Sequence, residues 1–369
     1  MEERNTFLED INGAIYLLKE KQATGELLDE SQLATAYSRR GMLYFENNMF
    51  DESILDYDRC IEIMERLRDE SKSPSANEYA KACAGRGMTY HVVGDFEKSF
   101  SDITKCIDIW EGLQRDGQHI EENLLFSMYI IRGGTLTYMN GNTDDAISDY
   151  RKSIMIAERL RTAGKPFDED GLAEAYMGIA QSYDQKEEFG EANKYYDQCI
   201  GIWERRKSEG QPLLDESNLG TAYMNRGANY FALNDNARAL SDHNKNIRIR
   251  EQLLSNGIKD DTYMVSISYR NRALSHKAAS DTTSAEKDYI SALSVLRADF
   301  NERPELQEVY YDILAELVVL LRTENERALF GVLQEFLFSM RSVPKTEEAE
   351  EAQNSILEQL SLRDLGGIL

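Results

Sequence analysis

The sequence predicts an all-α protein built as a solenoid of stacked helical hairpins. One segment recurs six times along the 369 residues, and its small residue returns every 46 or 47 positions. Aromatic and small residues within each copy follow the spacing of a helix face. The chain has only 5 prolines, so few positions break a helix. A hairpin that cannot bury its apolar face alone must stack on its neighbours, which predicts one continuous core.

The repeats are anchored on a small residue in the first helix of each unit. The successive anchors are Gly41, Gly87, Gly134, Ala180, Gly227 and Ala273, with steps of 46, 47, 46, 47 and 46 residues. Around them, a small residue on each helix permits close approach, and aromatic residues fill the surrounding space. The pattern therefore predicts two packed helices in every unit.

These residues resemble the tetratricopeptide repeat. The first unit carries the set Tyr37, Gly41, Tyr44, Ser53, Tyr57 and Cys60, and the fourth carries Tyr176, Ala180, Tyr183, Ala192, Tyr196 and Cys199. The resemblance covers about residues 30–300, and the fifth unit departs from it at His243 and Asn246. It implies a right-handed superhelical solenoid of antiparallel helix pairs. The family's usual unit has about 34 residues, so each unit here is longer.

The extra residues extend the second helix of each unit. Its apolar pattern continues to a glycine that suits a left-handed helix end, at Gly117, Gly164, Gly210 and Gly257. The next first helix begins at an acidic cap, at Asp29, Glu121, Asp168 or Asp215. An apolar residue comes directly before each cap, as in a hydrophobic staple, at Leu28, Ile120, Phe167 and Leu214. Each unit is therefore expected to hold two helices of roughly 17–20 residues.

Three regions follow from this pattern. Residues 1–28 are expected to hold the second helix of an amino-terminal half repeat, and residues 29–302 six hairpins. Residues 303–369 are expected to form a degenerate seventh pair and a capping helix, from segments 306–322, 326–341 and 347–362. Phe330, Phe336 and Phe338 are expected to be buried in that cap, and the alternative is a homodimer contact.

Composition excludes several classes of function. The formal charge is −24, and no basic stripe is present to bind the phosphates of nucleic acid or an anionic membrane. The amino terminus lacks the apolar core of a signal peptide, and no apolar run approaches the length of a membrane span. Four unpaired cysteines favour a reducing compartment. We expect a cytoplasmic protein with no metal and no cofactor.

Four arginines of the first helices are matched by aspartates in the second helices of the same units. The pairs are Arg40 with Asp56, Arg86 with Asp102, Arg226 with Asp242, and Arg272 with Asp288. The fourth unit lacks both charges, with Ile179 and Tyr195, and the third has Asp149 with its arginine displaced by one position, at Arg132. Joint presence and absence predicts a structural ion pair between the two helices of a unit.

The resemblance implies that the first helices line a concave groove. The residues carried over to that groove are Met42, Phe45, Ala84, Met88, His91, Met128, Ile131, Tyr138, Met224, Asn225, Phe231, Arg270, Asn271 and Lys277. A strip of methionine and aromatic side chains suits an apolar or helical ligand. Asn225 and Asn271 are expected either to hold a peptide backbone or to be ordinary solvated asparagines.

The predicted function is a non-catalytic scaffold that binds a protein or peptide segment in this groove. No nucleophile elbow, phosphate loop or dinucleotide-binding turn is present, so an enzyme is not expected. One alternative is a regulator that senses a small signalling peptide by closure of the superhelix. The other is a self-assembling structural protein that uses the carboxyl-terminal helices.

Overall fold

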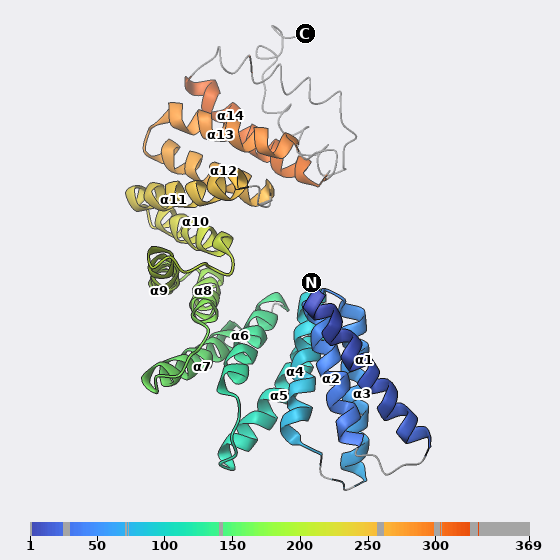
Figure 1. The fold of residues 1–369 in the computed structure, drawn as a ribbon. Helices are drawn as coiled ribbons and strands as arrows, with labels where there is room; N and C mark the ends of the chain where they lie inside the picture. Colours follow the sequence, from blue (N-terminus) through green and yellow to red (C-terminus); the bar gives the residue numbers. More distant parts are fainter. Residues whose placement is uncertain are drawn as a thin grey trace. The chain divides into compact units, whose positions relative to one another are not determined.

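The structure is a computed structural model that describes residues 2–24, 30–70, 72, 74–139, 143–256, 262–298, 303, 305–324 and 331. Within these ranges every regular element is an α-helix (Figure 1). The predicted all-α class is therefore confirmed. The chain divides into two compact units, Met1–Lys186 and Glu187–Leu369, each with its own packing.

The first unit contains eight helices within its described residues. They are α1 (Glu2–Ala23), α2 (Glu30–Glu46), α3 (Phe50–Asp69), α4 (Ala76–Val93), α5 (Phe96–Arg115), α6 (Glu122–Tyr138), α7 (Thr143–Thr162) and α8 (Glu169–Gln185). Consecutive helices pack on each other from α1 to α8, and the hairpin partners α2–α3, α4–α5 and α6–α7 share the most extensive contacts. This is the arrangement expected of stacked helix pairs.

The second unit continues the same alternation. Its described helices are α9 (Phe189–Ser208), α10 (Glu216–Ala232), α11 (Asn236–Ser255), α12 (Thr262–Ala278), α13 (Thr282–Ala298) and α14 (Leu306–Glu324). Here α10 pairs with α11 and α12 with α13, while α14 packs on α13. First helices have 17 or 18 residues, and the second helices from α3 to α11 have 20.

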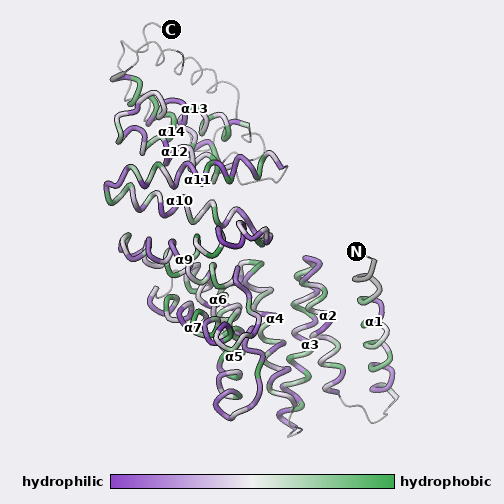
Figure 2. Tube along the Cα trace, turned by 60° about the vertical axis from the view of Figure 1, so that its left-hand side comes forward, coloured by the Kyte–Doolittle hydropathy of each residue, from purple (hydrophilic) through white to green (hydrophobic). Residues whose placement is uncertain are grey.

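The first helices of each unit form a layer of their own. In the first unit α2 contacts α4, α4 contacts α6, and α6 contacts α8, and in the second unit α10 contacts α12. Hydrophobic and hydrophilic residues alternate along the helices (Figure 2), as expected where one face of each helix is buried. The resemblance places the predicted groove on the opposite face of this first-helix layer.

Helix ends follow the predicted chemistry in most places. Gly117, Gly164 and Gly210 have φ angles of 73°, 65° and 73°, the left-handed region that favours glycine after a helix. The Asp168 and Asp215 carboxylates cap α8 and α10 by accepting backbone hydrogen bonds. The Glu121 side chain makes no such bond. Residues 25–29 and 257–261, which include Leu28, Asp29 and Gly257, lie outside the described residues.

The staple residues differ in their burial. Ile120 is 6% exposed, as expected for a residue that packs on the following helix. Leu214 is 79% exposed, so its predicted role as a buried staple is wrong. Asp215 caps α10 through its own carboxylate, and the helix end therefore does not depend on a packed Leu214.

The register of the third repeat differs from the predicted one. A Cβ atom on Gly133 would lie 3.0 Å from the Tyr150 ring, just as one on Gly41 would lie 3.3 Å from the ring of Tyr57. Gly133, not Gly134, therefore occupies the close-packing position. Helices α2, α4 and α6 start at residues 30, 76 and 122. The additional residue consequently falls between the glycine and α7, and Arg132 is in register with the other arginines.

The carboxyl-terminal helix α14 is buried on most of its surface. Ile313, Leu317 and Leu321 are each at most 1% exposed, as the apolar segment 306–322 predicted. Segments 326–341 and 347–362, with Phe330, Phe336 and Phe338, lie outside the described residues, apart from residue 331. Among the helices that the structure describes, none has both the length and the apolar character to cross a membrane.

Candidate functional site

Five arginine–aspartate pairs join the two helices of a repeat. In each, the arginine Nε and Nη2 atoms donate to the two oxygens of one carboxylate at 2.5–2.9 Å, in the pairs Arg40–Asp56, Arg86–Asp102, Arg132–Asp149, Arg226–Asp242 and Arg272–Asp288. All five aspartates are at most 5% exposed. Bidentate pairs of this kind fix geometry as well as charge, so these residues hold the hairpins together.

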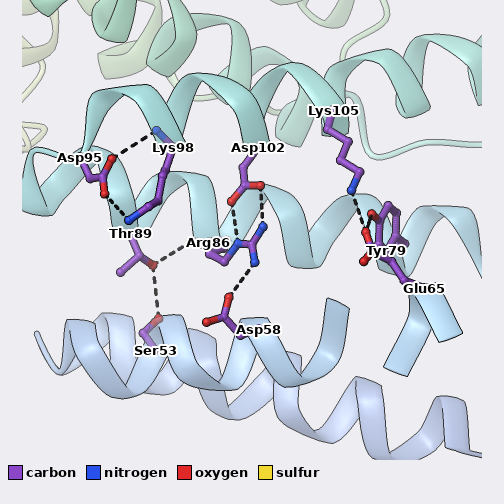
Figure 3. Close-up of polar contacts among 11 residues, drawn as sticks. Ser53, Asp58, Glu65, Tyr79, Arg86, Thr89, Asp95, Lys98, Asp102 and Lys105 are labelled. Carbon is purple, nitrogen blue, oxygen red and sulfur yellow. Dashed lines mark hydrogen bonds and ion pairs between the residues drawn. The ribbon is translucent and has the colours of Figure 1, made fainter. Parts of the chain in front are cut away.

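The same arginines also reach the preceding repeat. Arg86 Nη1 donates to Asp58 of α3 at 2.6 Å (Figure 3). The corresponding acceptors of Arg40, Arg132, Arg226 and Arg272 are Asn12, Thr104, Asp197 and Asn244. Each arginine therefore bridges three helices. Asn12 lies in α1, so α1 supplies for Arg40 the acceptor that a preceding second helix supplies for the other arginines.

A second polar contact, missed by sequence reasoning, links neighbouring repeats through tyrosine. The Tyr79 hydroxyl donates to Glu65 at 2.6 Å, and Lys105 Nζ donates to the same carboxylate at 2.9 Å (Figure 3). The hydrogen bond from Tyr79, and to a smaller extent that from Lys105, lowers the pKa of Glu65 below its ordinary value. Equivalent groups are Tyr129, Glu111 and Lys152, and Tyr223, Glu204 and Lys245. The sequence could have predicted this contact, because the glutamate and the lysine are separated by nearly the same number of residues in each of these groups.

Several predicted groove residues of the first unit remain accessible on the first helices. Met42 of α2 is 57% exposed and Tyr138 of α6 is 65% exposed. Phe45, Met88, His91 and Ile131 are partly exposed. Met128 and Ala84 are buried, at 1% and 6% exposure, so their assignment to the groove is wrong. Met128 faces the core because the register of the third repeat is shifted by one residue.

Aromatic rings line the end of this surface at the turns between helices. The Tyr138 ring stacks on Phe96 with a centroid distance of 4.8 Å and an interplanar angle of 4°. His91 contacts both rings edge-on, at 5.6 and 5.9 Å, and its Nδ1 lies 2.9 Å from Thr135 Oγ1. Burial lowers the pKa of His91, so the neutral ring is favoured. The stacked rings hold an exposed tyrosine in a fixed orientation.

The predicted groove residues of the second unit mostly have partners within the protein. Met224 is 8% exposed, and its Sδ accepts a hydrogen bond from Ser268, so its predicted position on the groove surface is wrong. Arg270 forms an ion pair with Glu316 of α14 at 2.5 Å. The charge of Arg270 is thereby neutralised by the next helix. Phe231 and Asn271 are partly exposed, and Lys277 is exposed.

Asn225 has a structural contact in this structure. Its Nδ2 donates to the Tyr196 hydroxyl of the preceding second helix at 3.1 Å. Tyrosines at that place in other repeats pack under a glycine, as Tyr57 does under Gly85. The asparagine therefore takes part in the contact between repeats, which favours the structural interpretation over a peptide clamp for this residue.

The four cysteines belong to the core. Cys60, Cys83, Cys106 and Cys199 are all free and buried. Burial raises the pKa of Cys60 to about 12 and that of Cys83 to about 11. A thiol with a raised pKa is a poor nucleophile at neutral pH. Within the described part of the chain, no group of three or more His, Cys, Asp or Glu residues is placed to hold a metal ion.

Two segments of the chain match a known family model. Residues 34–65 and 173–202 match the family model of the tetratricopeptide repeat. These segments are the first and fourth repeats, which carry the full set of aromatic and small residues. The chain therefore contains tetratricopeptide repeats. No curated protein sequence matches it at a significant level.

Solved structures share its fold at low sequence identity. A signal-transduction ATPase with a tetratricopeptide repeat sensor from Pyrococcus horikoshii has a TM-score of 0.57 and 16% identity, covering 99% of this chain and 51% of its own. The apo form of RapI has a TM-score of 0.54 and 16% identity, covering 87% and 98%. The apo quorum sensor NprR from B. thuringiensis has a TM-score of 0.52 and 16% identity, covering 98% and 99%. These likenesses establish the fold alone.

Proposed function

We propose that this tetratricopeptide-repeat protein is a non-catalytic scaffold that binds an apolar segment of a protein or peptide on the first-helix face of its first unit. The observation that carries the proposal is the exposure of Met42 and Tyr138 on that face. Large apolar side chains exposed on one layer of helices are costly to leave in water, and such surfaces often mark interaction sites.

The chemistry of this face favours an apolar ligand. Met42 and Met88 provide flexible side chains that adapt to the shape of a bound helix or extended peptide. The stacked Phe96 and Tyr138 rings provide a rigid contact at the other end. The neutral form of His91 adds no charge, and the Arg132 guanidinium is already bound to Asp149. A bound segment is therefore expected to make few ionic contacts there.

In the second unit, Phe231, Asn271 and Lys277 are proposed as a separate, smaller binding surface. Lys277 is exposed and Asn271 is partly exposed, so both can reach a ligand. Met224, Asn225 and Arg270 are left out of this proposed surface because of their contacts within the protein. The absence of catalysis, nucleic-acid binding, metals and cofactors, and the cytoplasmic location, stay predictions.

A ligand-responsive regulator is the second candidate. The fold resembles that of NprR, which is described as a quorum sensor. In this alternative a small peptide bound to the first helices would compact the solenoid. Small-angle scattering with and without the bound peptide distinguishes the regulator from the scaffold. The radius of gyration should decrease on binding for a regulator and stay unchanged for a rigid scaffold. The self-assembly alternative requires residues outside the described part of the chain, and light scattering that shows a monomer at tens of micromolar would exclude it.

The scaffold proposal is tested with two variants, each of which introduces one negative charge on a different face of the first unit. Met42→Glu places a carboxylate on the proposed binding face, and Met155→Glu places one on α7, where Met155 is 68% exposed. Both variants and the parent are used to capture proteins from a lysate of the source organism. We expect Met42→Glu to lose partners that Met155→Glu retains. Equal capture by all three would contradict the assignment of the groove.

A further inference from the structure

An open cleft lies on the second-helix side of the second unit. Helices α9 and α11 border it, and α10 contributes the floor. Ten residues line it, among them the cations Arg205, Lys207, Lys245 and Arg248 and one carboxylate, Glu204. The cleft therefore carries an excess of positive charge in a protein with a formal charge of −24.

The positive charge is particular to this cleft. Six corresponding positions of the α9–α11 cleft hold Gly201, Glu204, Arg205, Lys207, Lys245 and Arg248, with a formal charge of +3. Between α3 and α5 the same positions hold Glu62, Glu65, Arg66, Arg68, Lys105 and Asp108, with a formal charge of 0. The α5–α7 and α11–α13 positions have formal charges of −1 and 0. A general feature of the repeat therefore does not explain it.

Most of the cations have weak partners at the surface. Arg205 lies 3.4 Å from Glu209, Lys207 lies 3.2 Å from Glu216, and Lys245 lies 3.7 Å from Glu204. Exposed pairs of this kind contribute little to stability and exchange readily. Arg248 is exposed and forms no ion pair with any residue that the structure describes. The cleft therefore has one cation more than its own carboxylates neutralise.

Gly201 is exposed and has no side chain to occupy the α9 side of the cleft. A Cβ atom on this residue would meet nothing within 4 Å, so the surface of α9 is open at this point. The wall beside it includes Leu219 and Ile249, and the Lys245 ammonium lies 4.7 Å from the centroid of the Tyr223 ring. A ligand side chain placed over Gly201 would lie next to apolar atoms, with cations at the rim.

We propose that this cleft binds an acidic peptide segment, with one carboxylate on Arg248 and a neighbouring aliphatic side chain over Gly201. A carboxylate forms a bidentate pair with a free guanidinium. A polyphosphate or nucleic acid fits less well, because Glu204, Glu209 and Glu216 lie among the cations and repel a dense anion. The site shares no residue with the apolar face of the first unit.

The test uses the full chain and a fluorescein-labelled octapeptide of alternating glutamate and leucine, followed by fluorescence anisotropy at low salt. We expect binding to the parent protein and at least about tenfold weaker binding to Arg248→Glu, because the reversed charge repels the ligand. Gly201→Leu should weaken binding by about fivefold or more, because the added side chain would occupy the space proposed for the aliphatic side chain of the ligand. An octapeptide with glutamine in place of glutamate should bind no better than the Arg248→Glu variant binds the acidic one.

Matched controls are available elsewhere in the chain. Arg115→Glu makes the same change in net charge on an exposed arginine of α5, and Gly112→Leu adds the same side chain to another open glycine of that helix. Both should bind the acidic octapeptide within about twofold of the parent. Equal binding by all variants, or no binding by the parent, would overturn the proposal. Displacement of the peptide by single-stranded DNA of eight nucleotides at equal or lower concentration would also overturn it, in favour of phosphate.

Discussion

A Cβ atom added to Gly85 would lie 2.2 Å from Cζ of Tyr57. Tyr57 projects from α3 and is 5% exposed, so its ring has little room to move away. The same relationship recurs between Gly178 and Tyr150, where the distance would be 2.3 Å. At these two places the glycine is needed because the tyrosine of the preceding repeat packs directly on the helix backbone.

Gly85→Ala is therefore expected to destabilise the first unit by about 1–3 kcal/mol, the usual cost of overpacking a filled core. Gly112→Ala is the matched control, because an added Cβ there would meet only the end of the Arg115 side chain, at 3.9 Å. Alanine is the better helix former, so this variant should gain about 0.5–1 kcal/mol. Urea unfolding followed by Trp110 fluorescence in a Trp203→Phe background measures both. Effects of the same sign would contradict the packing role of Gly85.

Removal of one member of the Arg86–Asp102 pair is expected to cost more than removal of both. Asp102 is 5% exposed, so Arg86→Leu leaves a buried carboxylate without its guanidinium and should cost about 3–5 kcal/mol. The double variant Arg86→Leu/Asp102→Leu removes both charges and should be less destabilised. Urea unfolding of Arg86→Leu, Asp102→Leu and the double variant gives the coupling energy. A double-variant loss equal to the sum of the two single losses would show that the pair contributes no coupling.

Sequence periodicity was sufficient to predict the helices, because 46- or 47-residue spacing and helix-face patterns are local properties of the chain. The ion pairs Arg40–Asp56 and Arg86–Asp102 were also visible, since both members appear or disappear together. The third contact of each arginine was not predicted. It joins Arg86 to Asp58 in the preceding repeat, where the acceptor varies between Asn12, Thr104 and Asn244, and so shows no constant residue type.

The candidate binding face was predicted less well, because exposure depends on register and on tertiary partners. A glycine pair at Gly133 and Gly134 offers two registers, and the structure selects the first, which buries Met128. Met224 and Arg270 have the spacing of groove residues, but Ser268 and Glu316 come from later repeats and occupy them. These contacts depend on how the helices stack, which the pattern within one repeat does not specify.

Acid is expected to destabilise the second unit through His243. Its ring is 1% exposed, it packs against Gly227, and neither ring nitrogen has a hydrogen-bond partner among the described residues. Burial, with the nearby Arg272 charge, lowers the pKa of His243 from 6.5 to about 4. The unfolded chain therefore binds this proton first as pH falls. The free energy of unfolding should decrease between about pH 6.5 and pH 4, by about 3 kcal/mol in total.

His243→Tyr should remove this part of the pH dependence. Tyr57, Tyr150 and Tyr196 occupy the same place in other repeats, so a tyrosine fits against Gly227. His119→Tyr changes an exposed histidine and serves as the control. Urea unfolding at pH 7 and pH 4.5, followed by Trp203 fluorescence in a Trp110→Phe background, compares the three proteins. A parent and a His243→Tyr variant with the same pH dependence would exclude His243 as the cause.

Two methionines that share the spacing of groove residues are expected to respond oppositely to a charge. Met224→Glu should destabilise the second unit by more than about 3 kcal/mol, because its side chain is 8% exposed and a carboxylate there would be buried without a cation. Met42→Glu should change the free energy of unfolding of the first unit by no more than about 0.5 kcal/mol, because 57% of Met42 is exposed and the carboxylate remains in water. Urea unfolding of each variant, with the tryptophan of its own unit as the reporter, makes the comparison. A large decrease in the free energy of unfolding for Met42→Glu would mean that Met42 supports the fold. A loss of partner binding by this variant could then not be attributed to the proposed binding face.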